Sequence, residues 1–395
     1  MEQDWLKQVK NRIEHVPTKS GRSSKWGKIS FDNLTFVPAQ LAKRPIDYYQ
    51  ENIKSNTIIG KLSSRPIKIE IPVVMGAMSF GALSREAKIA LAKASTLANT
   101  LENSGEGGVL PEERQFAQHL IIQYSTGRFG LNEEILQQAD AIEIKIGQGA
   151  KPGSGGFLPK EKITEEIAQI RKIPMNESIH SPAYHKDIKN VQDLKKKISW
   201  LRKLTKGVPI IIKLGAGDIE KDIKIAIQAK PDIIAIDGME GGTGASPEVL
   251  SNELGIPTLA ALVKARATLN KLKAPQELWI GGGFYKGGDV AKALALGADV
   301  VFMGSALLGA MGCLGCGLCY SGQCPKGIAT QDNRLRQNLN IEEAAKYIAN
   351  FLKNCTEEVK MIAGACGKNN IYHLDKNDLR SLDETTSKIA KIPLV

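Results

Sequence analysis

The stretch WIGGGFYKGGDVAKALALGADVVFMGSALL, residues 279–308, decides the fold class. An apolar run ends in three consecutive glycines, a segment with helical apolar spacing follows, and a second apolar run stops at Met303. Strand, glycine-rich loop, helix and strand form one unit of an α/β protein with a parallel sheet. Bare backbone amides at two neighbouring strand ends, each followed by a helix, predict a cradle for a phosphate group.

The same unit recurs along most of the chain. Apolar, β-branched runs typical of strands covered on both faces occur at 69–78, 141–149, 208–217, 232–242, 277–283 and 298–307. Amphipathic segments such as KITEEIAQIRK, LAALVKARATLNKLK and GGDVAKALALGA lie between them. This repetition fits a (β/α)8 barrel or a doubly wound sheet. Glycines and polar residues at the strand ends, and the lack of a G-x-G-x-x-G motif at the first strand, favour the TIM barrel.

The rest of the chain is expected to decorate this barrel. Residues 1–68 predict an irregular N-terminal extension that wraps the barrel, with a short helix near Trp5 to His15. The barrel itself is expected over 69–312, and a cysteine-rich loop is inserted at 313–332. Residues 333–395 have a helical and polar pattern, which predicts a C-terminal helical cap.

Composition narrows the class of protein. Of the 395 residues 42% are hydrophobic and 38 are glycine, and the formal net charge is +11. No apolar stretch is long enough to cross a bilayer and the N-terminus is charged, so we expect a cytoplasmic protein with no membrane partner. Because the lysines are scattered and lack interleaved aromatics, the charge is expected to steer anionic substrates or an acidic electron donor, not nucleic acid.

The stretch CLGCGLCYSGQCP, residues 313–325, holds four of the six cysteines. Thiols stay reduced in a cytoplasm, so this cluster predicts metal or redox chemistry and not a disulfide scaffold. Cys355 and Cys366 stand apart and are expected to be buried as small hydrophobes. Lys213, within the apolar run IIIKLG, predicts an interior ammonium that needs an anionic partner, such as a reduced flavin ring, or a lysine that faces solvent at a frayed strand end.

Several motifs together resemble the synthase domain of glutamate synthase, a flavin-containing barrel. They are GAMSFGALSREAK (76–88), NSGEGG (103–108), STGRFGLNEEIL (125–136), EIKIGQGAKPGSGGFLP (143–159), DGMEGGTGASP (237–247) and CYSGQCPKGIATQ (319–331). The similarity runs from about residue 70 to 332 and is to the short, stand-alone type found in archaea and some bacteria. It implies FMN, an iron–sulfur cluster, and reduction of the imine that ammonia forms with 2-oxoglutarate.

The resemblance also implies roles for the cysteines. In the family, C-x5-C-x4-C-P holds a [3Fe–4S] cluster, and Cys313, Cys319 and Cys324 reproduce that spacing. Cys316 is an additional thiol, and four thiolates at this spacing can complete a [4Fe–4S] cube, which we favour over [3Fe–4S]. Zinc is the competing metal, but paired zinc-binding knuckles usually lie farther apart.

Site residues carried over from the family form two groups. The flavin envelope is expected to comprise Met78, Ser79, Gln148, Lys213, Gly242, Gly281, Gly282, Gly283, Gly304 and Ser305. Lys151 and Arg171 resemble the cations that hold the oxo-acid carboxylates, and Glu106 resembles the carboxylate beside the substrate. Ser154 and Phe157 replace a Glu and a Gln of the family pattern, which leaves the oxo-acid specificity open. His185 is expected to be structural more than catalytic.

The missing modules imply partners. No N-terminal nucleophilic cysteine follows Met1, so ammonia is expected from a separate glutaminase subunit. Electrons are expected from a ferredoxin-like or NAD(P)H-oxidising subunit, and the assembly is expected to be an oligomer. Three alternatives stay open: a methylamine–glutamate transferase that forms N-methylglutamate, a flavin-dependent isomerase like the type 2 isopentenyl diphosphate isomerase, and a non-enzymatic electron-transfer subunit.

Overall fold

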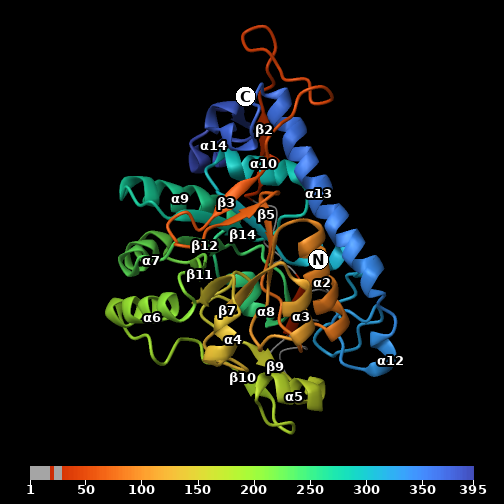
Figure 1. The fold of residues 1–395 in the computed structure, drawn as a ribbon. Helices are drawn as coiled ribbons and strands as arrows, with labels where there is room; N and C mark the ends of the chain where they lie inside the picture. Colours follow the sequence, from red (N-terminus) through yellow and green to blue (C-terminus); the bar gives the residue numbers. More distant parts are fainter. Residues whose placement is uncertain (1–17, 22–28) are drawn as a thin grey trace, which may run out of the picture.

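A barrel of eight parallel strands forms the centre of the computed structural model, which describes residues 18–21 and 29–395 (Figure 1). The strands are β5 (Val73–Met75), β6 (Leu101–Asn103), β7 (His119–Tyr124), β8 (Ala141–Lys145), β11 (Ile210–Gly215), β12 (Ile233–Asp237), β14 (Glu277–Gly281) and β15 (Val300–Met303). They hydrogen-bond in the order β5-β15-β14-β12-β11-β8-β7-β6. The two ends of this order, β5 and β6, contact each other, so the barrel is nearly closed. The predicted (β/α)8 fold is confirmed.

Six of these strands lie within the six apolar runs of the sequence, but β6 and β7 were not predicted. β6 has only three residues, and two of them, Glu102 and Asn103, are polar yet 1% and 2% exposed. β7 likewise carries Gln123, which is 2% exposed. These polar side chains find partners only in the folded protein, Glu102 on the outer helix that carries Lys88 and the other two inside the barrel, and sequence alone does not reveal such partners.

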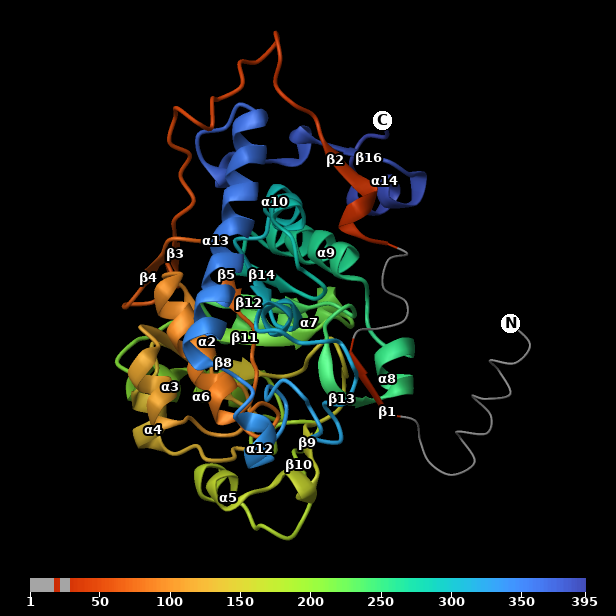
Figure 2. The same cartoon turned by 90° about the vertical axis from the view of Figure 1, so that its right-hand side faces the viewer.

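An outer ring of helices covers the strands (Figures 1 and 2). The helices are α2 (Arg85–Leu97), α3 (Pro111–Phe116), α4 (Glu133–Gln137), α6 (Val191–Leu204), α7 (Ile219–Ala226), α9 (Thr258–Lys271), α10 (Gly287–Ala295) and α13 (Ile341–Ala365). Several of these helices begin at an N-cap residue whose side chain accepts a backbone hydrogen bond. At the start of α2, for example, Ser84 Oγ accepts the Ala87 N–H. The long helix α13 packs against both α2 and α10. It therefore stands where the eighth helix of the ring belongs.

A hairpin closes one end of the barrel. β3 (Thr57–Ile59) and β4 (Ile67–Ile69) pair antiparallel, and their isoleucines join a buried cluster made by the inward-facing strand residues. This cluster comprises Ile59, Ile67, Ile69, Val74, Leu101, Ile121, Ala141, Ile211, Ile233, Ala235, Trp279 and Val300. Because the hairpin fills the amino-terminal end with apolar side chains, the carboxyl-terminal mouth is left for chemistry.

Between β8 and α6 the chain makes an excursion beyond the strand ends. It contains the hairpin β9 (Phe157–Leu158) and β10 (Ile179–His180), a 3-10 helix (Lys160–Lys162) and α5 (Glu165–Arg171). The segment KITEEIAQIRK does form a helix, but α5 lies at the lower end of the molecule in Figure 1 and not in the outer ring. The excursion thereby places Arg171 and Lys162 near the mouth.

Shorter elements connect the two ends of the chain to the barrel. β1 (Thr18–Gly21) pairs with β13 (Thr243–Pro247), and β2 (Leu34–Phe36) pairs with β16 (Leu379–Ser381). The helix expected near Trp5 to His15 lies outside the described residues, and the expected domain boundaries stay predictions. Within residues 18–21 and 29–395, none of the helices combines the length and apolar character that crossing a membrane requires.

Candidate active site

A polar network crosses the barrel interior at the carboxyl-terminal end of four adjacent strands. Glu143 on β8 accepts hydrogen bonds from Asn103 Nδ2 at 3.0 Å and Gln123 Nε2 at 2.6 Å. Its Oε1 atom also lies 2.6 Å from Lys213 Nζ on β11. Of the two alternatives left open by the sequence, Lys213 is therefore the interior ammonium, and its anionic partner within the protein is Glu143. The four buried side chains satisfy one another and form a rigid floor for the mouth.

Above this floor, Glu106 lies among cations. Lys145 Nζ is 3.1 Å from Glu106 Oε2, and the Arg171 guanidinium also acts on this carboxylate. Burial alone would raise the pKa of Glu106, but Lys145, the Ser181 hydroxyl and Arg171 outweigh it and hold the pKa at about 2. Glu106 Oε1 is buried and accepts no hydrogen bond from the part of the chain that the structure describes. Glu106 is thus ionised at neutral pH and offers one unused acceptor oxygen.

Lys151 is a buried cation near the same carboxylate. It is 8% exposed, and its ammonium has no hydrogen-bond or ion-pair partner within residues 18–21 and 29–395. Burial, with a further contribution from Lys145, lowers the pKa of Lys151 to about 8, while Glu106 opposes the shift. A buried ammonium without a partner is unfavourable unless an anion binds beside it.

Arg171 at the end of α5 is held by backbone. Its Nε donates to Phe80 O at 3.0 Å and its Nη2 lies 3.2 Å from Ser79 Oγ. Gly107 has φ +144°, and a Cβ atom there would lie 2.6 Å from the guanidinium carbon. Only glycine lets the Gly105–Gly107 loop and Arg171 approach this closely. Burial lowers the pKa of Arg171 to about 10, so the guanidinium still carries its charge at neutral pH.

The loop that carries Gln148 and Lys151 is fixed against β12. Asp237 Oδ2 accepts the Gly149 N–H at 2.8 Å, and a Cβ at Gly149 would lie 1.9 Å from Gly238 O. Burial raises the pKa of Asp237, while Lys213 opposes the shift. The tight approach of the loop to β12 explains why glycine precedes Ala150 and Lys151.

His185 is hydrogen-bonded at both ring nitrogens. Its Nδ1 accepts from Arg128 at 2.8 Å, so its Nε2 carries the proton and donates to Lys145 O at 2.7 Å. The imidazole stacks on Tyr124 with ring centroids 6.0 Å apart. Burial lowers the pKa of His185, so the ring stays neutral and holds the Lys145 backbone in place.

The residues predicted to bind flavin surround the mouth from several strands. Met78 and Ser79 follow β5, and a Cβ at Gly105 would lie 2.6 Å from their backbone. A Cβ at Gly242 would lie 2.0 Å from Ser305 Oγ, so these two positions are neighbours. Gly304 caps α11 (Ser305–Ala310), and a Cβ there would meet open space. Gly281 ends β14, and Gly282 and Gly283 have φ values of +115° and +82°.

All six cysteines carry free thiols. In the cysteine loop, Cys324 is buried, Cys313 and Cys319 are half-buried, and Cys316 is exposed. Burial raises the pKa of Cys319, and the thiols of Cys313, Cys324 and Cys316 raise it further, so the four side chains interact electrostatically. The Gly315 N–H lies 3.4 Å from Cys313 Sγ. Among the described residues, no three His, Cys, Asp or Glu side chains converge on the position of a single metal ion.

The two cysteines outside the loop are buried, as predicted. Cys355 and Cys366 are 4% and 2% exposed. Burial raises the pKa of Cys355 to about 12 and that of Cys366 to about 11, so both thiols stay protonated and unreactive at neutral pH.

Lys162 lies beneath the cysteine loop. Its Nζ is 3.2 Å from Cys319 O, 3.3 Å from Ala82 O and 3.5 Å from Ala329 O. Burial lowers the pKa of Lys162 to about 8, whereas the thiols of Cys319 and Cys324 act in the opposite direction. The lysine thereby joins the 3-10 helix of the excursion to both sides of the cysteine loop.

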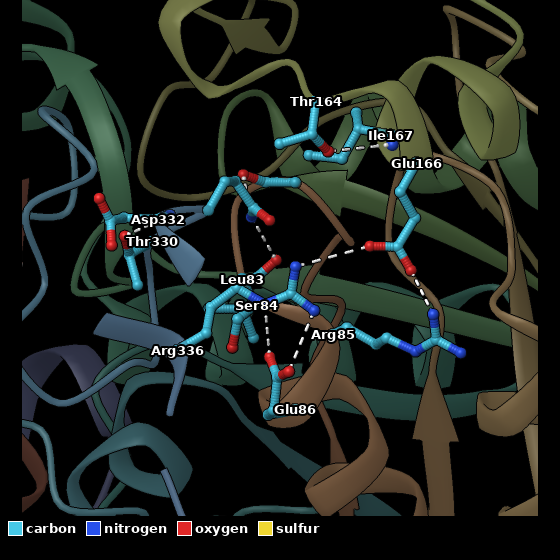
Figure 3. Close-up of polar contacts among 12 residues, drawn as sticks. Leu83, Ser84, Arg85, Glu86, Thr164, Glu166, Ile167, Thr330, Asp332 and Arg336 are labelled. Carbon is cyan, nitrogen blue, oxygen red and sulfur yellow. Dashed lines mark hydrogen bonds and ion pairs between the residues drawn. The ribbon is translucent and has the colours of Figure 1, made fainter. Parts of the chain in front are cut away.

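The chain that leaves the cysteine loop is anchored by ion pairs (Figure 3). Arg336, in α12 (Asn333–Arg336), binds both oxygens of Glu86 at 2.8 and 3.0 Å. Figure 3 shows Glu166 of α5 between Arg336 and Arg85, and Arg336 Nη1 lies 3.6 Å from Glu166 Oε2. In addition, the Ser84 N–H donates to Ile328 O at 2.8 Å. The cysteine loop, α5 and the start of α2 therefore form one connected unit.

Phe157 packs against the cysteine loop. Its ring centroid lies 4.6 Å from that of His180 and 6.3 Å from that of Tyr320. Tyr320 directly follows Cys319 in the sequence. The aromatic side chain of Phe157 thus links the β9–β10 hairpin to the cysteine loop.

Sequence reasoning missed four charged residues of this region: Lys145, Glu143, Arg128 and Lys162. Glu143 and Lys145 alternate with isoleucines in AIEIK, a pattern that does signal side chains of different type on the two faces of a strand. Arg128 and Lys162 carry no such signal, because loops of the folded chain bring them to their partners. One cavity of about 770 Å³, lined by residues such as Arg202 and Gln276, lies at the opposite end of the barrel.

Comparisons with known proteins agree on the fold and the family of sequences. A family model described as a conserved region in glutamate synthase matches residues 7–369. The chain is 38% identical to a glutamate synthase large subunit-like protein of Rhizobium meliloti, with 92% of this chain and 87% of that protein covered. It is also 38% identical to the archaeal glutamate synthase [NADPH] of Methanocaldococcus jannaschii, with 88% and 74% covered. The structure of the monotopic membrane protein (S)-mandelate dehydrogenase aligns with a TM-score of 0.59 at 15% identity, covering 95% of each chain.

Proposed function

This chain belongs to the glutamate synthase family, and we propose that it is the synthase subunit that reduces 2-iminoglutarate, formed from ammonia and 2-oxoglutarate, to L-glutamate. Membership of this family makes the chain an oxidoreductase. The observation that carries the substrate assignment is the buried, unpartnered ammonium of Lys151 beside Glu106, Lys145 and Arg171.

The charges at this place match a dicarboxylate. Lys145, Lys151 and Arg171 supply three positive charges, and Glu106 supplies one negative charge, so a net charge of +2 (3 − 1) is left. 2-Oxoglutarate carries two carboxylates and would neutralise it. The forked guanidinium of Arg171 suits one carboxylate and the Lys151 ammonium suits the other. The Phe80 carbonyl and Gly107 hold Arg171 in a fixed orientation, so little rotamer entropy would be lost on binding.

Glu106 is suited to bind the nitrogen of ammonia and of the imine. Because its pKa is about 2, it cannot donate a proton at neutral pH, but its unused Oε1 can accept one hydrogen bond. We assign this oxygen to the N–H of ammonia and then of the protonated imine, whose positive charge the carboxylate stabilises. His185 fixes the Lys145 backbone and thereby the Lys145–Glu106 ion pair.

The mouth fits FMN. Open space beside Gly304, the left-handed backbone at Gly282 and Gly283, and the contact of Gly242 with Ser305 form a cradle in which side chains would obstruct a ligand. We propose that these residues, with Gly281, hold the phosphate, and that Met78, Ser79, Gln148 and Lys213 face the ring. Bound FMN would supply the hydride that reduction of an imine needs and that no side chain provides.

The cysteine loop fits an iron–sulfur cluster. Cys313, Cys316, Cys319 and Cys324 provide four free thiols that interact electrostatically, and the Gly315 N–H points at one sulfur. In a cluster each thiolate binds a different iron, so the thiols need not converge on one ion as they would for zinc. We propose a [4Fe–4S] cluster, with [3Fe–4S] as the alternative. Bound there, it would relay single electrons.

Ammonia and electrons are proposed to come from partners. A separate glutaminase subunit would supply ammonia, and a ferredoxin-like or NAD(P)H-oxidising subunit would supply electrons; several relatives are named glutamate synthase [NADPH]. We further propose that the protein acts as an oligomer in the cytoplasm.

The function is tested with protein purified without oxygen. Ammonium, 2-oxoglutarate and reduced methyl viologen should yield glutamate, and Lys151→Met should lose most of this activity and of the 2-oxoglutarate affinity. Lys189→Met, at an exposed position of the same excursion, is the control and should behave like the wild type. Formation of N-methylglutamate from methylamine and glutamate, without formation of glutamate, would instead support the transferase alternative. Unchanged turnover in Lys151→Met would refute the substrate assignment.

A further inference from the structure

Lys162 is a buried cation without a full counter-charge in the protein. It is 6% exposed, and none of the described aspartates and glutamates forms an ion pair with it. Its ammonium meets three backbone carbonyls, those of Ala82, Cys319 and Ala329. Its methylene stem lies under Gly322, where an added Cβ would be 3.4 Å from Lys162 Cγ. The side chain is therefore held under the cysteine loop and is largely shielded from solvent.

Carbonyl groups alone do not offset the cost of this charge. They satisfy the three N–H donors, but a buried ammonium still needs a negative charge nearby. The thiols near enough to act on its charge are those of Cys319 and Cys324, and as thiolates they would favour the charged ammonium. Once such thiols bind iron as thiolates, the loop beside Lys162 becomes anionic.

We propose that Lys162 is the counter-cation of the cluster-binding loop and raises the midpoint reduction potential of the cluster held there. This inference rests on the proposed function, because it needs the four cysteines to bind an iron–sulfur cluster. Adding an electron makes a cluster more negative, and a fixed cation at its edge stabilises that reduced state. Net charge and hydrogen bonds around the sulfurs are established determinants of cluster potential.

The position of Lys162 also couples the loop to the flavin side of the mouth. Ala82 lies three residues after Ser79, and the carbonyl of Phe80 in the same segment holds Arg171. Lys162 is thus a positioning residue that ties together the segment after β5 and two points of the cysteine loop, Cys319 and Ala329. A neutral residue able to donate hydrogen bonds would preserve this tie and remove only the charge.

Three variants separate charge from packing. Lys162→Gln keeps two N–H donors and loses the charge, and Lys162→Arg keeps the charge. Lys160→Gln removes an exposed lysine from the same 3-10 helix and serves as the control. Each protein is purified without oxygen, its iron content is measured, and the fraction of reduced cluster is followed by electron paramagnetic resonance during a redox titration with dithionite and mediators.

We expect the ratio of reduced to oxidised cluster at the wild-type midpoint to fall about tenfold in Lys162→Gln, a shift of about −59 mV for a one-electron couple. Lys162→Arg and Lys160→Gln should stay within about twofold of wild type, because the first keeps the charge and solvent screens the second. Loss of iron in Lys162→Gln but not in Lys162→Arg would also support the counter-cation role.

An unchanged midpoint in Lys162→Gln, an equal shift in Lys162→Gln and Lys162→Arg, or loss of iron in both would overturn this inference and leave the proposed function intact. A wild-type protein that shows no cluster signal after iron and sulfide are supplied would instead overturn the proposed electron relay, and this inference with it. The two failures are therefore distinguishable.

Discussion

Replacement of Lys88 is the most direct test of how the barrel closes. Lys88 on α2 is fully buried, and its Nζ lies 2.6 Å from Glu102 Oε1 and 3.0 Å from Glu113 Oε1. It also donates to Met78 O at 2.7 Å and to Asn103 O at 3.2 Å, beyond the ends of β5 and at the end of β6. These are the two strands at the open seam of the sheet, so one ammonium connects both edges of the barrel.

The charge balance of Lys88, Glu102 and Glu113 determines how much stability the protein loses when Lys88 is replaced. Burial and Glu102 raise the pKa of Glu113 well above its usual value, and the shorter ion pair of Lys88 is the one with the carboxylate of Glu102. Lys88→Met leaves that carboxylate buried without a cation. Removing one partner of a buried ion pair costs about 3–5 kcal/mol, and we expect the free energy of unfolding to fall by this amount at pH 7.5.

Urea unfolding followed by circular dichroism measures the effect. Lys93→Met is the control: Lys93 lies on the same helix but pairs with the exposed Glu342, and its loss should cost at most about 1 kcal/mol. Lys88→Met/Glu102→Gln should regain part of the stability, because the carboxylate that lost its buried cation is removed as well. A loss below about 1 kcal/mol at pH 7.5 would refute the argument that Lys88 holds the seam.

Three further predictions concern the mouth. Affinity for 2-oxoglutarate should fall as the pH rises through about 8, because only protonated Lys151 attracts the anion; calorimetry should find no such step in Lys151→Met. Gly105→Ala should lose bound FMN, because the added Cβ would lie 2.6 Å from the Met78 backbone. Gly288→Ala is the control and should keep FMN, because no atom lies within 4 Å of its added Cβ. Equal flavin absorbance in the two purified variants would contradict this prediction. His185→Asn should keep turnover within about tenfold of wild type, since a general acid or base contributes about 10²–10⁴-fold; a hundredfold loss would mean that the imidazole transfers protons.

The sequence was sufficient for the barrel where strands are long and apolar. The runs that contain β8, β11, β12, β14 and β15 are β-branched and continuous because both faces of these strands are covered. It failed at β6 and β7, where buried polar residues interrupt the apolar ones. It also placed α5 among the ordinary crossovers, although this helix lies beyond the strand ends, because amphipathic spacing reports only that one face of a helix is buried and not which partner buries it.

The residues of the candidate site were also predicted only in part. The motif resemblance singled out Glu106, Lys151 and Arg171, and the structure brings Glu106 and the two cations into one electrostatic group. The sequence could not reveal that Lys145 would complete this group or that Glu143 would form an ion pair with Lys213. It also could not reveal that Lys162 would lie under the cysteines.

Local pattern by itself determined that this chain repeats strand and helix, ends its strands in glycine and gathers four thiols in one loop, because hydrophobic periodicity, backbone freedom and thiol chemistry are properties of neighbouring residues. Only the tertiary structure decided which charges meet. The field at a buried group depends on partners far apart in sequence, as Lys151 near Glu106 and Arg171 beside Gly107 show. Those pairings exist only after the barrel has closed.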